Sequence, residues 1–199
     1  VLTEGLPWEW ETFPDFLDRL EARDFDVDVA AQLPHSAVRV YVMGERGADH
    51  TVAASEAEIA RMAELTHSAL LAGAMGFSTS RTPNHKTSDG HHLGTLRAGR
   101  AELTAIAGAL ARAGRGVLQI VSEATGSADA ALVGSELELF RHLVETAQRP
   151  LSMSIAQSSE APEQWRTLLD FAQQMSAAGH VVKGQVAPRP VGVIMSFAT

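Results

Sequence analysis

The chain has 199 residues, of which 45% are hydrophobic and 6% aromatic, so a core is expected to consist of Ala, Leu, Val and Ile. Its net charge of −8, with no basic block, argues against a nucleic-acid partner. No cysteine is present, which excludes disulfides and cysteine-based zinc sites, and no apolar run reaches the roughly 20 residues of a membrane span.

The ends of the chain favour an internal fragment of a longer polypeptide. The chain starts at Val1 without Met, stops inside the apolar run VGVIMSFAT, and contains no signal peptide. We therefore expect a cytoplasmic protein in which residues 1–199 form one incomplete domain.

The first predicted helix follows an aromatic-rich stretch, EGLPWEWETFPDFLDRLEA. Pro14 suits the first helical turn, where its missing N–H has no partner in any case. Apolar residues from Phe13 to Leu20 recur at spacings of three to four, which indicates one apolar face. Trp8 and Trp10 are expected either to pack on the rim of the domain or to line a pocket.

Two β-rich runs are predicted next. Val27, Val29 and Ala31 alternate with polar or small residues, as in a strand that ends near Leu33. After Pro34, the run AVRVYVM (residues 37–43) predicts a second short strand.

Four further helices are predicted from their start and stop signals. They begin at a capping box of Ser55 with Glu58, at about Arg100, at a second capping box of Ser135 with Glu138, and near Pro162. Short β-like runs, AMGFSTS, GVLQIVS, PLSMSIA and HVVKGQVA, alternate with these helices.

This alternation predicts parallel strands joined by helical crossovers. The fold is then a (β/α) barrel or a doubly wound sheet, and the absence of G-x-G-x-x-G after a strand counts against a dinucleotide-binding sheet. A whole barrel takes about 250 residues, so we expect an incomplete (β/α)8 TIM barrel.

Polar residues follow the predicted strands where the mouth of such a barrel would lie. The simpler explanation is that strand ends are polar because they reach solvent. The candidates are His35, Ser78, Thr79, Ser80, Arg81, Gln119, Ser122 and Glu123, together with Gln157, Ser158, Gln185 and Arg189.

Two of these positions carry alternative interpretations, and a third polar residue, Arg39, lies inside a predicted strand. His35 is a candidate ligand or substrate contact, or a structural hydrogen-bonding residue. Arg39 must find a carboxylate or carbonyl partner if it is buried. Glu123 is a candidate general acid or base, or a clamp for a substrate amine, or simply a solvated residue.

Histidine spacing alone does not predict a zinc site. The sequence has neither His-x-His nor His-Glu-x-x-His, and His91 and His92 would point in opposite directions in an extended segment. His67 and His142 lie within predicted helices and are expected to be structural.

Long motifs resemble the N-acyl-D-amino-acid deacylase (D-aminoacylase) branch of the amidohydrolase superfamily. They include EGLPWEWETFPDFLDRLEA, DVDVAAQLPHSAVRVYVMGERGA, GAMGFSTSRTPNHKT, GVLQIVSEA and WRTLLDFAQQMSAAGHVVKGQVAPRPVGVIM. The resemblance implies a metal-dependent barrel that hydrolyses an amide with a metal-activated water, zinc being the usual metal. It also implies that the His-x-His strand and the catalytic Asp lie outside this chain.

The sequence departs from that family at two expected metal ligands. Its strands LQIVSE and PLSMSIAQ lack the histidines of better-known deacylases and carry Gln119, Gln157 or apolar residues there. Neutral amides replace imidazole poorly at zinc, so we expect the metal to be held outside this chain or its site to be altered.

The resemblance also implies a set of site residues in this chain. Family-like positions are His35 and Arg39 in PHSAVR, and Ser78, Ser80 and Arg81 in the following segment. Arginine can hold a carboxylate with two parallel hydrogen bonds. The predicted substrate contacts are His35, Arg39, Ser78, Ser80, Arg81, His85 and Gln119, with Glu123 as the catalytic residue.

Three functions remain open from the sequence. The first is hydrolysis of an N-acyl amino acid or related small amide, and the second is a non-catalytic barrel that binds a small carboxylate. An aldolase or phosphate-binding isomerase is less favoured, because only Lys86 and Lys183 are present and no glycine-rich phosphate loop is evident. An open part-barrel should be inactive alone and should associate through its strand edges, which makes a homo-oligomer possible.

Overall fold

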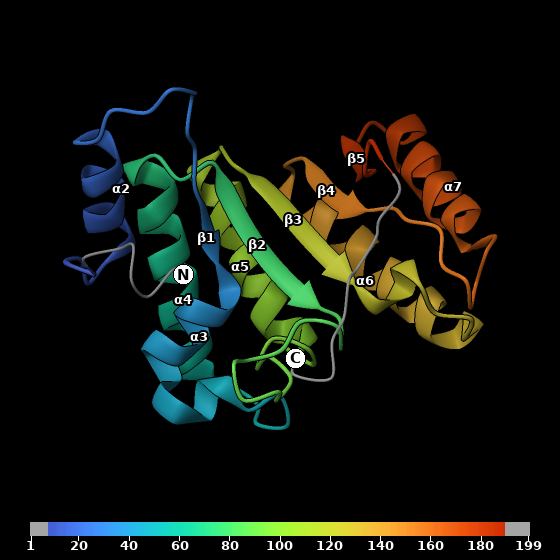
Figure 1. The fold of residues 1–199 in the computed structure, drawn as a ribbon, viewed down its shortest axis with the longest axis horizontal. Helices are drawn as coiled ribbons and strands as arrows, with labels where there is room; N and C mark the ends of the chain where they lie inside the picture. Colours follow the sequence, from blue (N-terminus) through green and yellow to red (C-terminus); the bar gives the residue numbers. More distant parts are fainter. Residues whose placement is uncertain (1–7, 190–199) are drawn as a thin grey trace.

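The computed structural model describes residues 8–189, so the predicted apolar end VGVIMSFAT lies outside the described residues. One parallel sheet contains the strands in chain order, β1-β2-β3-β4-β5 (Figure 1). The strands are β1 (Gln32–Pro34), β2 (Gly76–Arg81), β3 (Val117–Ser122), β4 (Leu151–Ser154) and β5 (Val182–Gln185). The helices are α2 (Phe13–Glu21), α3 (His35–Met43), α4 (Glu56–Ala72), α5 (Arg100–Ala113), α6 (Ala130–Ala147) and α7 (Gln164–Ala177), with 3-10 turns η1 (Gly44–Ala48) and η2 (Glu123–Thr125).

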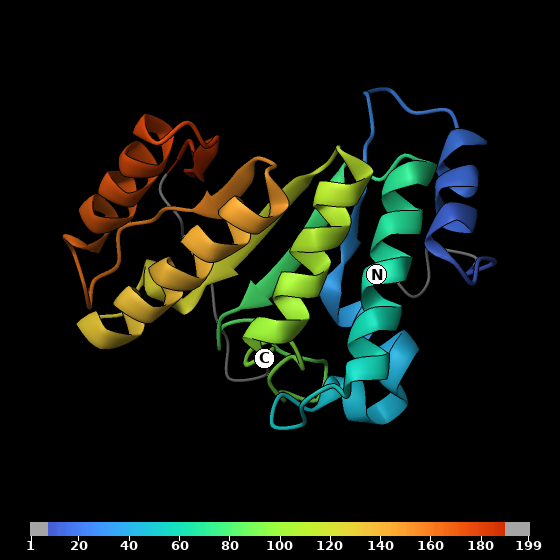
Figure 2. The same ribbon diagram turned by 180° about the vertical axis from the view of Figure 1, so that it is seen from behind.

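The strand order distinguishes between the two folds that the sequence left open. Every strand pairs in parallel with its predecessor in the chain. Helices α4, α5 and α6 lie along one face of the sheet, as Figure 2 shows. A doubly wound sheet reverses its strand order and carries helices on both faces. The sheet therefore has the arrangement of part of a barrel wall.

The core lies between the sheet and these helices. Phe77 of β2, Ile120 of β3 and Leu151 of β4 are fully buried and pack with Leu110 of α5 and Leu143 of α6. Successive side chains of a strand point to opposite faces. The residues between these core positions therefore point to the face that α4, α5 and α6 leave uncovered.

Most predicted helices and strands are confirmed. Helix α4 has the predicted capping box, in which Ser55 Oγ accepts from the Glu58 backbone N–H and the Glu58 carboxylate accepts from the Ser55 N–H. Helix α5 ends at Gly114, which adopts a positive φ of 63°. Within residues 8–189, no helix combines the length and hydropathy that crossing a bilayer requires.

Of the two strands predicted before residue 44, the first starts later than expected and the second is wrong. Residues 27–31 are not part of the sheet, Val27 is 72% exposed, and β1 begins only where Gln32 pairs with Gly76. The run AVRVYVM lies in helix α3, whose buried residues His35, Val38, Arg39 and Met43 are spaced as one helical face. Tertiary packing of that face outweighs the β propensity of its valines.

The predicted start of the helix at Ser135 is also wrong. Helix α6 begins at Ala130, and its N-cap is Asp129, whose carboxylate accepts from the backbone N–H groups of Ala131 and Leu132. Ser135 lies inside the helix and donates its hydroxyl to the Leu132 carbonyl at 2.8 Å. The Ser135–Glu138 pattern matches a capping box, but Asp129 satisfies the helix N-terminus earlier in the chain.

This N-cap gives a stability prediction. Replacing Asp129 by Ala in the full-length protein is expected to lower its free energy of unfolding by about 0.5–2 kcal/mol, because two helix N–H groups lose their acceptor. Ser135→Ala, on the same helix, should change it by less than about 0.5 kcal/mol. Urea unfolding followed by circular dichroism measures both, and equal effects would contradict the assignment of Asp129 as the cap.

The predicted first helix forms at the periphery of the fold. Helix α2 has no fully buried residue, although Phe13 packs against the core. The rings of Trp8 and Trp10 have centroids 5.2 Å apart, and Trp10 lies at the same distance from Phe16. The tryptophans therefore pack on the rim of the domain, one of the two alternatives that the sequence allowed.

Candidate functional site

A buried ionic cluster joins α3, β2 and α5. The Glu102 carboxylate accepts from Arg39 Nη1 at 2.5 and 2.7 Å, and it lies 2.7 Å from His35 Nε2. His35 Nδ1 lies 2.8 Å from Thr79 Oγ1. The remaining donors of Arg39 reach the carbonyl oxygens of Gly47 and Val52. Every polar group of His35 and Arg39 is thus engaged within the protein.

Charge determines the hydrogen-bond directions in this cluster. Arginine is always charged and an ionised carboxylate only accepts, so His35 Nε2 donates to Glu102 while Nδ1 accepts from the Thr79 hydroxyl. Burial lowers the pKa of His35, against the opposing effect of Glu102, and keeps the imidazole neutral. Burial alone would raise the pKa of Glu102, but hydrogen bonds from His35 and Arg39 lower it overall.

A second buried cluster lies at the C-terminal ends of β2 and β3. Arg81 binds the Glu136 carboxylate of α6 through Nε at 3.0 Å and Nη2 at 2.6 Å. Arg81 Nη1 donates to the Ala98 carbonyl at 2.8 Å, and Ser122 Oγ donates to Glu136 at 2.8 Å. Arg81, Ser122 and Glu136 are all buried.

Ser80 and His85 lie together at the exposed end of β2. Ser80 Oγ is 2.7 Å from His85 Nδ1, and the Ser80 carbonyl accepts from Thr95 Oγ1 at 2.7 Å. The segment 82–99 thus folds back onto the end of β2. Two of the predicted substrate contacts are neighbours in space.

Glu123 follows β3 directly and pairs with Arg97 of the segment 82–99. The two side chains form an ion pair with two N–H···O contacts, and the carboxylate raises the pKa of Arg97. The Glu123 side chain is 13% exposed and that of Arg97 is 51% exposed. The mostly buried carboxylate of Glu123 therefore contacts the accessible guanidinium of Arg97 at the C-terminal end of the sheet.

The uncovered face of the sheet carries a polar row. Ser78, Gln119, Ser152 and Lys183 occupy one register across β2, β3, β4 and β5. Their neighbours Phe77, Leu118 and Leu151 are buried in the core, so these four side chains point away from it. Ser152 accepts a hydrogen bond from Gln185 Nε2 at 3.0 Å. The row offers hydroxyl, amide and ammonium groups rather than imidazoles.

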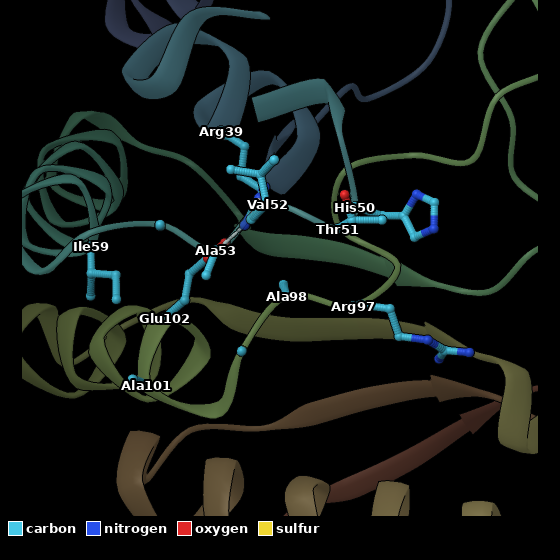
Figure 3. Close-up of a pocket in the computed structure, with 12 residues that line it drawn as sticks. Arg39, His50, Thr51, Val52, Ala53, Ile59, Arg97, Ala98, Ala101 and Glu102 are labelled. Atoms are coloured by element: carbon cyan, nitrogen blue, oxygen red, sulfur yellow. Dashed lines mark hydrogen bonds and ion pairs between the residues drawn. The ribbon is translucent and has the colours of Figure 1, made fainter. Parts of the chain in front are cut away.

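A cavity of about 520 Å³ lies on the other side of the sheet, between residues 50–54, α4 and the start of α5 (Figure 3). Its walls include Val52, Ala53 and Ile59, and the Arg39–Glu102 pair lines it. Figure 3 shows the Arg97 side chain pointing away from Ile59. Both arginines at this cavity are already paired with carboxylates.

The described residues do not form a metal site. Within residues 8–189, no three side chains of His, Cys, Asp or Glu are placed to hold a metal ion. Gln119 and Ser152 occupy the central strands of the polar row, and neutral amides and hydroxyls are poor zinc ligands. His92 pairs through its backbone with Lys86, and its ring packs against His50.

The structure divides the predicted site residues into two groups. Ser78, Ser80, His85, Gln119 and Glu123 lie on the uncovered face or at the C-terminal strand ends. His35, Arg39 and Arg81 lie in buried clusters between sheet and helices, with carboxylate partners, as the sequence required of a buried Arg39. No observation tests the predicted roles of either group, and those roles stay predictions.

Sequence reasoning missed Glu102 and Glu136, the two partners of those arginines. Each lies on the apolar face of its helix, with Ile106 four residues after Glu102 and Phe140 four residues after Glu136. An acidic residue at core spacing is the signal that could have found them, because a buried carboxylate requires a partner.

Comparison with known proteins identifies the family of this barrel. A family model described as "Amidohydrolase family" matches residues 3–192. The chain belongs to this amidohydrolase family. The predicted membership of the amidohydrolases is therefore confirmed over residues 3–192.

Individual relatives of this amidohydrolase chain cover shorter stretches. A D-aminoacylase of Alcaligenes xylosoxydans xylosoxydans is 39% identical over 79 residues, which are 40% of this chain and 16% of that protein. An uncharacterized protein of Mycobacterium bovis is 39% identical over 70 residues, which are 35% of this chain and 12% of that one.

Solved structures confirm the barrel fold. A D-aminoacylase variant in complex with copper chloride has a TM-score of 0.69 at 22% identity, and a second D-aminoacylase crystal structure has a TM-score of 0.64 at 21% identity. Each covers 89% of this chain, which spans 34% of the solved chain. The prediction of a partial TIM barrel of amidohydrolase type is thus confirmed.

Proposed function

We propose that the full-length protein is an amide hydrolase of the N-acyl-D-amino-acid deacylase type. The observation that carries the proposal is the Glu123–Arg97 pair at the C-terminal end of β3, in a chain of the amidohydrolase family. Active sites of (β/α) barrels lie at this end of the strands. The similarity to D-aminoacylase supports an N-acyl amino acid as the small-molecule substrate.

The proposed roles follow from where the side chains lie. Glu123 transfers protons to or from the reacting amide, and its low exposure favours this role. Ser78, Ser80, His85 and Gln119 provide hydroxyl, imidazole and amide groups for substrate contacts. We propose that His35, Arg39 and Arg81 support the substrate-contacting residues from behind and do not contact substrate themselves, because their own donors are bound to protein acceptors.

The proposal includes a zinc ion held by residues outside this chain, which would supply an activated water for attack on the amide carbonyl. The described residues form no such site, so their proposed roles do not depend on its geometry. We also propose that residues 1–199, as an incomplete barrel domain, are inactive alone and self-associate through the edges of β1 and β5, which within residues 8–189 have one strand neighbour each.

A second candidate is a non-catalytic barrel that binds a small carboxylate. The polar row Ser78, Gln119, Ser152 and Lys183 favours it, since an ammonium and neutral donors suit an anionic ligand better than a metal ion.

One experiment on the full-length protein distinguishes the two functions. We expect release of free amino acid from a panel of N-acyl-D-amino acids, stoichiometric zinc by elemental analysis, and loss of at least about 90% of the activity after chelation, as for a metal-activated water. Carboxylate binding without zinc or turnover would instead support the second candidate. The N-acyl-L-amino acids serve as the matched control for stereochemistry.

A further inference from the structure

One carboxylate joins the ends of two neighbouring strands. Arg81 and Ser122 are the last residues of β2 and β3, and they are register partners. Both bind Glu136 of α6, Arg81 through two nitrogens and Ser122 through its hydroxyl. Glu136 thus links the last residues of β2 and β3 at the end where the proposed substrate contacts lie.

Each residue held by Glu136 lies next to a proposed functional residue. Ser80 precedes Arg81 and points to the opposite face of β2, where it contacts His85. Glu123 follows Ser122, whose Oγ also accepts from the Ala124 backbone N–H at 3.1 Å and so caps the turn that contains Glu123.

The same cluster anchors the segment that carries Arg97. Arg81 Nη1 donates to the carbonyl of Ala98, the residue directly after Arg97. Three parts of the proposed site therefore depend on one buried carboxylate: the end of β2, the turn after β3 and the segment 82–99.

Stability alone explains this cluster poorly. Arg81, Ser122 and Glu136 are 7%, 6% and 5% exposed, and a buried ion pair is often no more stable than well-packed apolar residues of similar volume. A planar guanidinium bound through two nitrogens does, however, define direction and distance closely.

We propose that Glu136 is a positioning residue that orients Glu123, Arg97 and Ser80 through Arg81 and Ser122. This inference rests on the proposed function for its kinetic consequences. It is independent of that function in its structural consequences, because the segments 82–99 and 123–126 must lose order when the cluster is broken.

The test uses Glu136→Gln and Ser122→Ala in the full-length protein, with Glu138→Gln as the control. Glu138 lies on the same helix, and its ion pair with Arg100 is exposed. Ser122→Ala removes the hydrogen bonds of Ser122 with Glu136 and with the Ala124 N–H but leaves the Arg81–Glu136 ion pair, so it stays informative if Glu136→Gln fails to fold.

We expect Ser122→Ala to lower kcat about tenfold with little change in KM, because a displaced Glu123 affects the reaction rather than binding. Glu136→Gln should lower kcat and raise KM, since Ser80 and Arg97 move as well. Backbone amides of 82–99 and 123–126 should exchange hydrogen about tenfold faster than in Glu138→Gln, while those in the middle of α6 stay protected.

The outcomes separate the two proposals. If the parent protein hydrolyses no N-acyl amino acid, the proposed function fails, and hydrogen exchange still decides the role of Glu136. Folded variants with the exchange pattern of Glu138→Gln overturn the inference. A decrease in kcat no larger than the fraction of unfolded protein would also overturn the inference.

Discussion

Replacing Glu123 by Gln in the full-length protein is expected to lower kcat toward an N-acyl amino acid by about 10²- to 10⁴-fold, the usual contribution of a general acid or base. Gln has nearly the same shape as Glu and keeps an oxygen that can accept from Arg97. The substitution therefore removes the titratable group while disturbing the turn after β3 very little.

Glu145→Gln is the matched control, because Glu145 is an exposed carboxylate in the last turn of α6, which leads to the start of β4 rather than to the C-terminal strand ends. It should keep kcat and KM within about twofold of the parent values, as exposed positions usually do. Steady-state kinetics with an N-acyl-D-amino acid measures both variants. A Glu123→Gln protein with nearly full kcat would remove Glu123 from the catalytic role that we propose.

Replacing Glu102 by Ala is expected to lower the free energy of unfolding by about 3–5 kcal/mol, the usual cost of removing one partner from a buried ion pair. Arg39 would remain buried as an unpaired cation, and His35 Nε2 would lose its acceptor. Urea unfolding of the full-length protein at pH 7 measures the loss.

Glu64→Ala is the control for this substitution, since Glu64 pairs with Arg61 at 3.5 Å on the exposed side of α4. An exposed pair of this kind should contribute less than about 1 kcal/mol. Similar losses of unfolding free energy in the two variants would show that the buried cluster contributes no more to stability than an exposed ion pair.

The pH dependence of stability provides a second readout for Glu102. Burial holds the pKa of His35 in the folded state below its ordinary value of 6.5, so the unfolded state binds more protons and stability falls as the pH drops below about 6.5. The folded-state pKa of Glu102 lies below 4.5, so its contribution is present above 4.5 and is lost as the pH falls through the folded value. Both effects predict loss of stability on acidification. In Glu102→Ala, the loss of stability that protonation of Glu102 causes below about pH 4.5 should be absent.

Local patterns predicted those elements whose signals lie within one segment. The capping box at Ser55, the stop at Gly114 and the apolar runs of β2 and β3 are each complete within a few neighbouring residues. They satisfy backbone groups or bury side chains in a way that the rest of the fold does not alter. Helices α4 and α5 and the central strands could therefore be recognised directly.

Helix α3 shows where local patterns fail. Its valines favour a strand, yet His35 and Arg39 point into the protein on one helical face and meet Glu102, more than 60 residues later in the chain. Propensity differences are small compared with the effect of burying or exposing such a face. Only contacts between distant segments could decide this element.

The site divides in the same way. The sequence by itself determined the amidohydrolase family, the alternation of strand and helix, and the position of polar residues at the strand ends, because each of these patterns lies within short stretches of consecutive residues. The tertiary structure decided which polar residues are accessible. Arg81 and Glu123 look equivalent in the sequence, but strand alternation and the position of α6 bury the first against Glu136 and leave the second beside Arg97. That difference depends on side-chain direction and on partners 55 and 26 residues away, which no local pattern contains.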